Sequence, residues 1–153
     1  MKKIILILFL FSTSFIFSQE IDFKKGIITV DGKECMKYES SASNVTYQNL
    51  NGDDLIILKF IRVNGELYTK VIFVESRQEF TSQNYIFTKK NLVEKLIKSN
   101  TLVECALNEE KVNTFVLKYD EKVEERYNKS TTTNTVIIKE EPRKSGVNIN
   151  LGR

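Results

Sequence analysis

Two cysteines, Cys35 and Cys105, are the residues of this chain best suited to covalent chemistry, and there is no third. A disulfide between them would close a loop of about 70 residues, for which chain entropy predicts roughly 4 kcal/mol of stabilisation. Strand alternation opposes the bridge, because it places Cys35 on the opposite face from Met36 and Tyr38. The sequence therefore leaves two alternatives for these cysteines: a disulfide, or two buried free thiols.

Most other reactive constellations are excluded by residue type. The chain contains no histidine, which excludes Ser-His-Asp and Cys-His triads and imidazole zinc sites. Its six glycines form no phosphate-binding loop. Two cysteines alone would make an incomplete metal site. We therefore assign no catalytic residue, no cofactor and no metal ligand from the sequence.

An oxygen-rich stretch, Asn49–Asp54, resembles a calcium loop only in part. In the EF-hand pattern glycine follows the third ligand and a glutamate closes the loop. Here Gly52 comes early, and Lys59 and Phe60 occupy the region of that glutamate. The stretch is more typical of a hairpin turn.

Two carboxylate pairs, Asp120 with Glu124 and Glu121 with Glu125, are spaced four residues apart. On one continuous helix each pair would share a face. Basic residues are interspersed, which indicates a solvated helix face rather than an acidic site. These are Lys118, Lys122, Arg126 and Lys129.

The elements that must position these residues begin with a meander. Asp31-Gly32, Asn51-Gly52 and Asn64-Gly65 each separate strand-like segments, and such pairs favour tight hairpin turns. We predict strands at about 26–30, 33–39, 44–50, 54–62 and 66–75, with a short sixth at 79–81 or 85–87.

After Phe87 the apolar period changes from two to about 3.6. A first helix is predicted over 88–100, with Thr88 as N-cap. A second is predicted over 108–127, with Asn108 as N-cap. Its apolar stripe comprises Val112, Phe115, Val116, Tyr119, Val123 and Tyr127. Strands followed by helices predict an α+β fold: an antiparallel meander of five or six strands with two helices packed on the sheet.

The ends of the chain predict export and a polar tail. Residues 1–18 combine Lys2 and Lys3 with an apolar run and end at Ser18, the order of a secretory signal peptide. We expect a single domain over 19–128 and a flexible, disordered tail over 129–153. Two strand-like pieces of the tail, 135–138 and 147–151, could add to a sheet edge.

Export limits the partners. Losing Lys2 and Lys3 lowers the net charge from +3 to about +1, too weak a field to favour nucleic acid. The apolar run is shorter than the roughly 20 residues of a membrane span, so we expect no stable membrane anchor after cleavage. The expected location is the periplasm or the cell exterior.

Three stretches carry a resemblance: the signal ending Ser18-Gln19, the segment 26–33 and the segment 47–55. Together they are similar to small exported proteins of unknown function from Bacteroidetes. The likeness covers about the first 75 residues and lies in hairpin motifs. It implies the exterior of a Gram-negative bacterium and assigns no activity.

Three functions remain as hypotheses. The first is a non-catalytic exported module that binds an envelope or extracellular protein or ligand. The second is a glycan hydrolase in which two carboxylates flank a cleft. The third is a carrier that holds a small apolar ligand between the sheet and the helices, which predicts a sizeable cavity.

Overall fold

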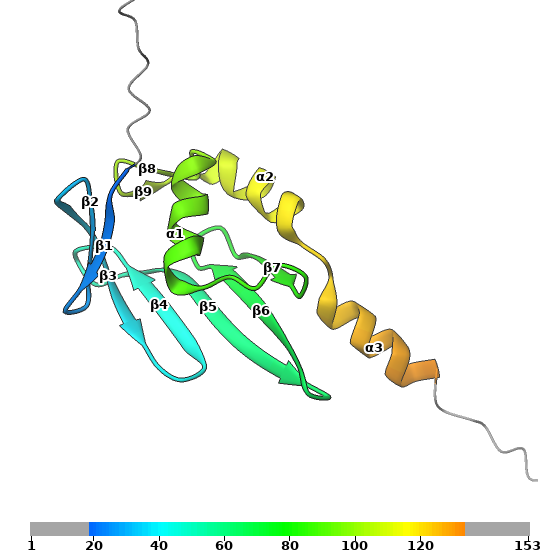
Figure 1. Cartoon of the computed structure of the whole chain (residues 1–153). Helices are drawn as coiled ribbons and strands as arrows, with labels where there is room; N and C mark the ends of the chain where they lie inside the picture. Colours follow the sequence, from blue (N-terminus) through cyan, green and yellow to red (C-terminus); the bar gives the residue numbers. More distant parts are fainter. Residues whose placement is uncertain (1–18, 134–153) are drawn as a thin grey trace, which may run out of the picture. The chain divides into compact units, whose positions relative to one another are not determined.

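The computed structural model of this chain describes residues 19–133. The predicted signal segment 1–18 and the strand-like pieces 135–138 and 147–151 lie outside the described residues. Seven strands form one antiparallel sheet in chain order, so that each strand pairs with the next (Figure 1). They are β1 (Ile21–Lys24), β2 (Ile27–Val30), β3 (Lys33–Ser40), β4 (Asn44–Gln48), β5 (Asp54–Val63), β6 (Glu66–Phe73) and β7 (Gln78–Ser82).

The helices follow the sheet in the sequence. They are α1 (Lys89–Lys98), α2 (Glu109–Tyr119) and α3 (Val123–Thr133). A two-stranded hairpin, β8 (Leu102–Val103) and β9 (Ala106–Leu107), connects the first two. The contacts divide the chain into two units, with the boundary between Val123 and Glu124. The predicted α+β class, with a meander preceding the helices, is confirmed.

The sheet has more strands than predicted because β1 carries no Asx-Gly signal. Its turn to β2 is formed by Lys25 and Gly26, both with positive φ, as a two-residue hairpin turn requires. Asp22 and Lys24 interrupt its apolar character. Of the two alternatives for a sixth strand, the structure has a strand at 78–82 and none at 85–87.

The predicted single helix over 108–127 is wrong, because the chain bends between Tyr119 and Val123. At the bend Lys122 has a positive φ of 51°. The peptide N–H of Glu121 donates to the carbonyl of Thr81 at 2.8 Å, and the N–H of Thr81 donates to Asp120 Oδ1 at 3.1 Å. Hydrogen bonds to the unpaired edge of β7 thus replace a continuous helix, although the apolar period continues.

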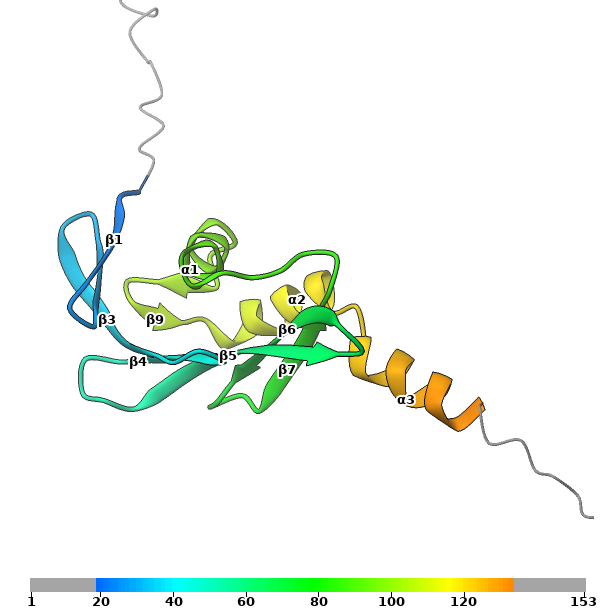
Figure 2. The same ribbon diagram turned by 60° about the horizontal axis from the view of Figure 1, so that its bottom comes forward.

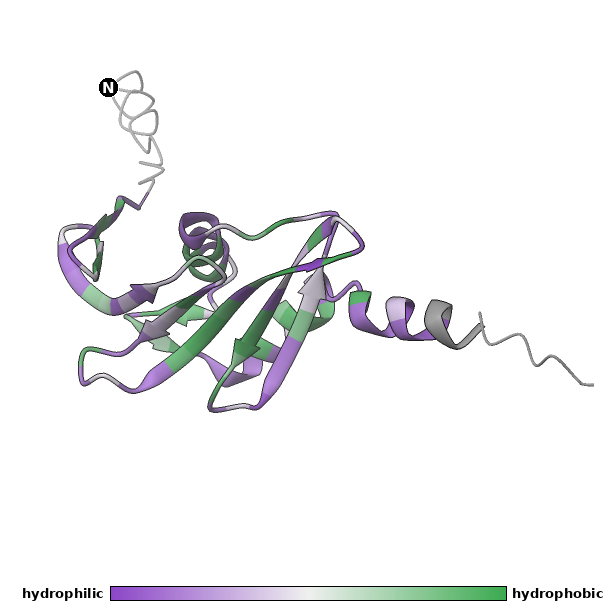
Figure 3. Ribbon diagram, turned by 90° about the horizontal axis from the view of Figure 1, so that it is seen from below, coloured by the Kyte–Doolittle hydropathy of each residue, from purple (hydrophilic) through white to green (hydrophobic). Residues whose placement is uncertain are grey.

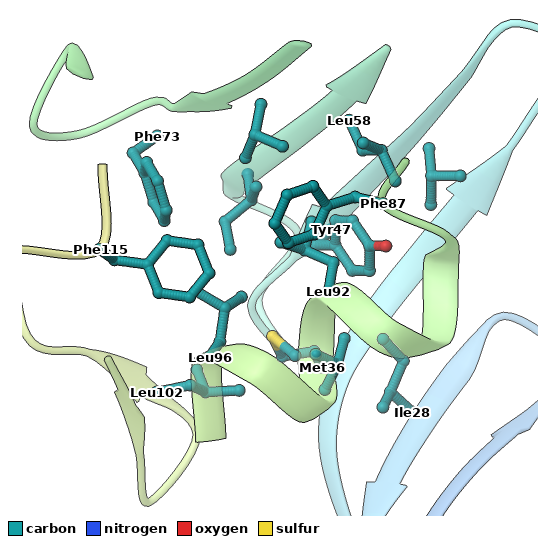
Figure 4. Close-up of a cluster of buried hydrophobic side chains, with 14 of the residues drawn as sticks. Ile28, Met36, Tyr47, Leu58, Phe73, Phe87, Leu92, Leu96, Leu102 and Phe115 are labelled. Atoms are coloured by element: carbon teal, nitrogen blue, oxygen red, sulfur yellow. The ribbon is translucent and has the colours of Figure 1, made fainter. Parts of the chain in front are cut away.

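The helices α1 and α2 cover the same face of the sheet, as the view of Figure 2 shows. Figure 3 shows the hydrophobic residues along the central strands and α2. In the core between the layers, Leu92 and Leu96 of α1 meet Met36 and Tyr47 of the sheet (Figure 4). Aromatic rings join α2 to the last strands, with the ring centroid of Phe115 6.2 Å from that of Phe73 and 5.8 Å from that of Phe80.

Both ends of α1 are capped by their own sequence. The predicted N-cap, Thr88, is confirmed: its hydroxyl accepts from the N–H of Asn91, and the Asn91 side chain accepts from the N–H of Thr88. At the other end Asn100 adopts a φ of 55°. The N–H groups of Asn100 and Thr101 donate back to Ile97 and Leu96, the pattern of a Schellman motif. This sharp stop directs the chain into β8.

Candidate functional site

A pocket of about 400 Å³ lies beside the joined cysteines. It brings together three parts of unit 1 that are distant in sequence: the β1 to β3 region, the end of α1 and the β8–β9 hairpin. The first part contributes Gln19, Val30, Asp31, Lys33 and Cys35. The other two contribute Ile97, Asn100, Leu102, Val103, Glu104 and Cys105.

Cys35 reaches the core side of the sheet through a β-bulge. Ile28 pairs with Met36 and Thr29 pairs with Glu34, which leaves Cys35 as the extra residue of β3. In a bulge of this kind two successive residues oppose one, and the regular alternation of faces is lost. Cys35 and Met36 are accordingly both buried in the core cluster. The alternation that opposed the disulfide does not apply at this position.

Cys105 reaches the pocket from the turn of the β8–β9 hairpin. Val103 pairs with Ala106, so Glu104 and Cys105 form a two-residue loop. Their φ angles are 49° and 68°, the positive values that a type I′ turn demands. Neither residue is a glycine, and the left-handed region is costly for other side chains. The surrounding structure must therefore hold this turn in place.

The disulfide supplies that support. Cys35 and Cys105 are joined, with their Cα atoms 5.1 Å apart. The bond ties the bulge of β3 to the turn between the helices across a sequence separation of 70 residues. It forms part of the pocket lining. Two walls of the pocket are thus covalently fixed to each other.

A second anchor holds the N-terminal wall. Asp31 has a φ of 51° and begins the turn between β2 and β3 with Gly32. Its Oδ1 accepts from the N–H of Glu20 at 3.0 Å, and its own N–H donates to the carbonyl of Glu20 at 2.8 Å. These bonds hold Glu20 in place, and the residue before it, Gln19, lines the pocket. This reciprocal pair fixes the start of the described chain against the β2–β3 turn.

The lining combines apolar and charged side chains. Cys35 and Leu102 are buried, with exposures of 3% and 4%, whereas Asp31, Lys33 and Glu104 are exposed. Within residues 19–133, neither Lys33 nor Glu104 has an ion pair or a side-chain hydrogen bond. The pocket therefore presents one ammonium and one carboxylate with no protein partner beside an apolar lining.

The oxygen-rich stretch forms a turn that satisfies its own polar groups. Asn49 Oδ1 accepts from the N–H groups of Gly52 and Asp53, each at 2.9 Å. Asn49 Nδ2 donates to Asp53 Oδ2 at 2.7 Å. Over the part of the chain that the structure describes, no group of three or more acidic or cysteine side chains is placed to hold a metal ion. The hairpin interpretation accounts for these residues.

The acidic residues of the bend lie elsewhere than predicted. Asp120 and Glu121 sit between two helices rather than on one helix face. Glu121 accepts from Ser82 Oγ at 2.8 Å and from the N–H groups of Gln83 and Asn84. Because these contacts hold the end of β7, the role of the two carboxylates here is structural.

Sequence reasoning missed the charged residues of the pocket. Asp31 was recognisable as a turn residue, but not as the residue that anchors Glu20. Glu104 carries no signal, since Glu-Cys is not a typical pair for a two-residue turn. Lys33 lies at the start of a strand. Only the fold brings Lys33 and Glu104 to one pocket.

Comparisons with known proteins found no relative of this chain. The chain matches no model of a protein family, no curated protein and no solved structure. Among residues 19–133, no helix is both long and apolar enough to cross a membrane.

Proposed function

We propose that this protein is an exported, non-catalytic binding module, and that the pocket beside the Cys35–Cys105 disulfide is its binding site. One observation carries the proposal: the pocket of about 400 Å³ has walls that a disulfide fixes. Binding sites are concave and largely preformed, with a few polar groups over an apolar lining. A fixed wall lowers the ordering cost of binding.

Export supports the same proposal from the sequence. Residues 1–18 have the composition of a signal peptide, and disulfides persist in oxidising compartments outside the cytoplasm. The partner is then an envelope or extracellular protein or ligand. The chain contains no histidine, which favours binding over the common hydrolytic mechanisms.

The proposal can be tested with a variant in which a larger side chain fills the pocket. Val103 lines it and is 45% exposed, so Val103→Trp places a large ring in the pocket at little cost to the core. Leu117→Trp is the matched control, because Leu117 is 75% exposed on α2 and is not a lining residue. Tagged mature forms are incubated with envelope extract and culture medium of the source organism, and retained molecules are quantified by mass spectrometry.

We expect a partner that the wild type and Leu117→Trp retain equally and that Val103→Trp loses. Retention of every partner by Val103→Trp would place binding outside the pocket and contradict the proposal. Turnover of a glycan or peptide substrate by the wild type would contradict the non-catalytic assignment and favour the carboxylate hydrolase.

A further inference from the structure

We propose that the pocket binds a short peptide of two or three residues with free termini and an apolar side chain. This inference rests on the proposed function and specifies the ligand of the same pocket. It follows from the two unpaired charges of opposite sign, Lys33 and Glu104, on different walls.

The disulfide limits how far apart these two charges can be. Lys33 lies two strand residues from Cys35, and Glu104 is adjacent to Cys105. Because the Cα atoms of the cysteines are 5.1 Å apart, the Cα atoms of Lys33 and Glu104 are at most about 16 Å apart. The four-carbon stem of lysine is flexible, so the ammonium group can adjust its distance to a ligand. This upper bound leaves room for a zwitterionic ligand with one charged end at each residue.

The charges assign the two ends of the ligand. The α-ammonium group would pair with Glu104, on the side where the turn exposes this carboxylate. The α-carboxylate would pair with Lys33. An uncharged ligand would form no ion pair with either group.

The apolar lining assigns the middle of the ligand. Leu102 is buried and Ile97 is partly buried, and both line the pocket. A leucine-sized side chain would remove their remaining apolar surface from water. The volume of about 400 Å³ lies near the lower end of the range for small-molecule sites. This size suits one or two side chains rather than a folded partner.

The experiment titrates the secreted protein with the dipeptide Leu-Leu and records backbone amide shifts by NMR. Since Gln19 also lines the pocket, the N terminus of the secreted chain is first read by mass spectrometry. The probes are Leu-Leu, its N-acetyl form, its C-terminal amide and the form with both ends blocked. We expect Leu-Leu to shift the amides of residues 100–105, and each blocked end to weaken binding about two- to five-fold, as exposed ion pairs do.

Single variants test which residue binds each end of the dipeptide. Glu104→Gln should weaken Leu-Leu about two- to five-fold and leave the N-acetyl form unchanged. Lys33→Gln should also weaken the binding of Leu-Leu about two- to five-fold, and it should leave the affinity for the C-terminal amide unchanged. Glu39→Gln and Lys37→Gln, on the same strand as Lys33 and outside the lining, serve as controls. Unchanged amide spectra away from the pocket show that the variants are folded.

Two results would overturn the inference: no shift of the pocket amides at millimolar Leu-Leu, or equal affinity for the free and fully blocked dipeptides. If either occurs while Val103→Trp still loses an envelope partner, the inference fails and the proposed function stands. Release of free leucine during the titration would instead contradict the proposed function, because the protein would then be a peptidase.

Discussion

At the scale of single residues, Cys35 shows how a local irregularity changes the chemistry available to a chain. Simple alternation directs it away from the face of Met36, yet the bulge buries both in the same cluster. One extra residue in β3 is therefore sufficient to let the disulfide form. The turn that presents Cys105 has positive φ angles at two residues other than glycine, and the disulfide ties it to β3.

Removing the disulfide should destabilise the fold strongly. For the double variant Cys35→Ala, Cys105→Ala we expect a loss of about 4 kcal/mol, because the bond closes a long loop in the unfolded chain. The free energy of unfolding in urea provides the measurement. Wild-type protein unfolded with reductant should match the variant, and equal stability of oxidised wild type and variant would refute the entropic argument.

Tyr47 is the buried titratable residue whose environment changes its ionisation most clearly. Burial raises its pKa above the ordinary value of 10.0, since the charged phenolate is poorly solvated in the core. Its hydroxyl donates to the carbonyl of Lys89 at 2.9 Å, in the first turn of α1. The neutral phenol thus joins β4 to the start of that helix.

This raised pKa predicts a pH dependence with a definite sign. Above about pH 10 the unfolded chain releases the phenolic proton while the folded chain keeps it, so stability falls as the pH rises. At pH 8, Tyr47→Phe should be about 1 kcal/mol less stable than the wild type, through the lost hydrogen bond. That difference should vanish by about pH 11. Urea unfolding of both proteins at pH 8, 10 and 11 measures it, and a constant difference would contradict the explanation.

At the scale of elements, the bend between α2 and α3 protects the last strand. An edge strand has unpaired backbone groups that invite pairing with another chain. Asp120 and Glu121 accept from the N–H groups of Thr81, Gln83 and Asn84, and the N–H of Glu121 donates to the carbonyl of Thr81. The end of β7 is therefore satisfied within the chain.

Truncating Glu121 should expose this edge. Glu121→Ala leaves Ser82 and the amides of Gln83 and Asn84 without their carboxylate, so we expect a loss of about 1.5–3 kcal/mol. Glu75→Ala, in the exposed turn between β6 and β7, is the control and should change stability by less than about 0.5 kcal/mol. Urea unfolding gives both values. Hydrogen exchange at Gln83 and Asn84 should accelerate in Glu121→Ala alone, and unchanged exchange would show that the carboxylate does not hold the edge.

At the scale of the whole molecule, the fold depends on one apolar layer between the sheet and the helices α1 and α2. Phe115 illustrates this dependence, because it is 2% exposed and contacts aromatic rings of β6 and β7. Leu117, two residues later on the same helix, is 75% exposed. Equal hydrophobicity therefore has opposite consequences at these two positions.

The two positions give a matched pair of variants. Phe115→Ala should cost about 3–5 kcal/mol, through lost burial and the cavity left behind. Leu117→Ala should change stability by less than about 0.5 kcal/mol. Thermal and urea unfolding test both. A large effect of Leu117→Ala would mean that this exposed face of α2 is covered in solution.

The sequence by itself determined the elements whose signals are local. Asx-Gly turns, strand alternation and the caps of α1 each act within a few residues, and they placed five strands, the first helix and the α+β class. The sequence also determined which chemistries are excluded, because the absence of histidine does not depend on the fold.

Only the tertiary structure decided the features that depend on distant partners. The apolar period predicts one helix through residues 120–122, but hydrogen bonds to β7 break it there. Alternation separates Cys35 from the face of Met36, but the bulge brings it to Cys105. The pocket lies where the disulfide joins β3 to the β8–β9 turn, and its lining brings together Lys33 and Glu104 across 71 positions of the sequence. Contacts of this kind carry no local signal, since their free energy arises only once the sheet and helices have packed.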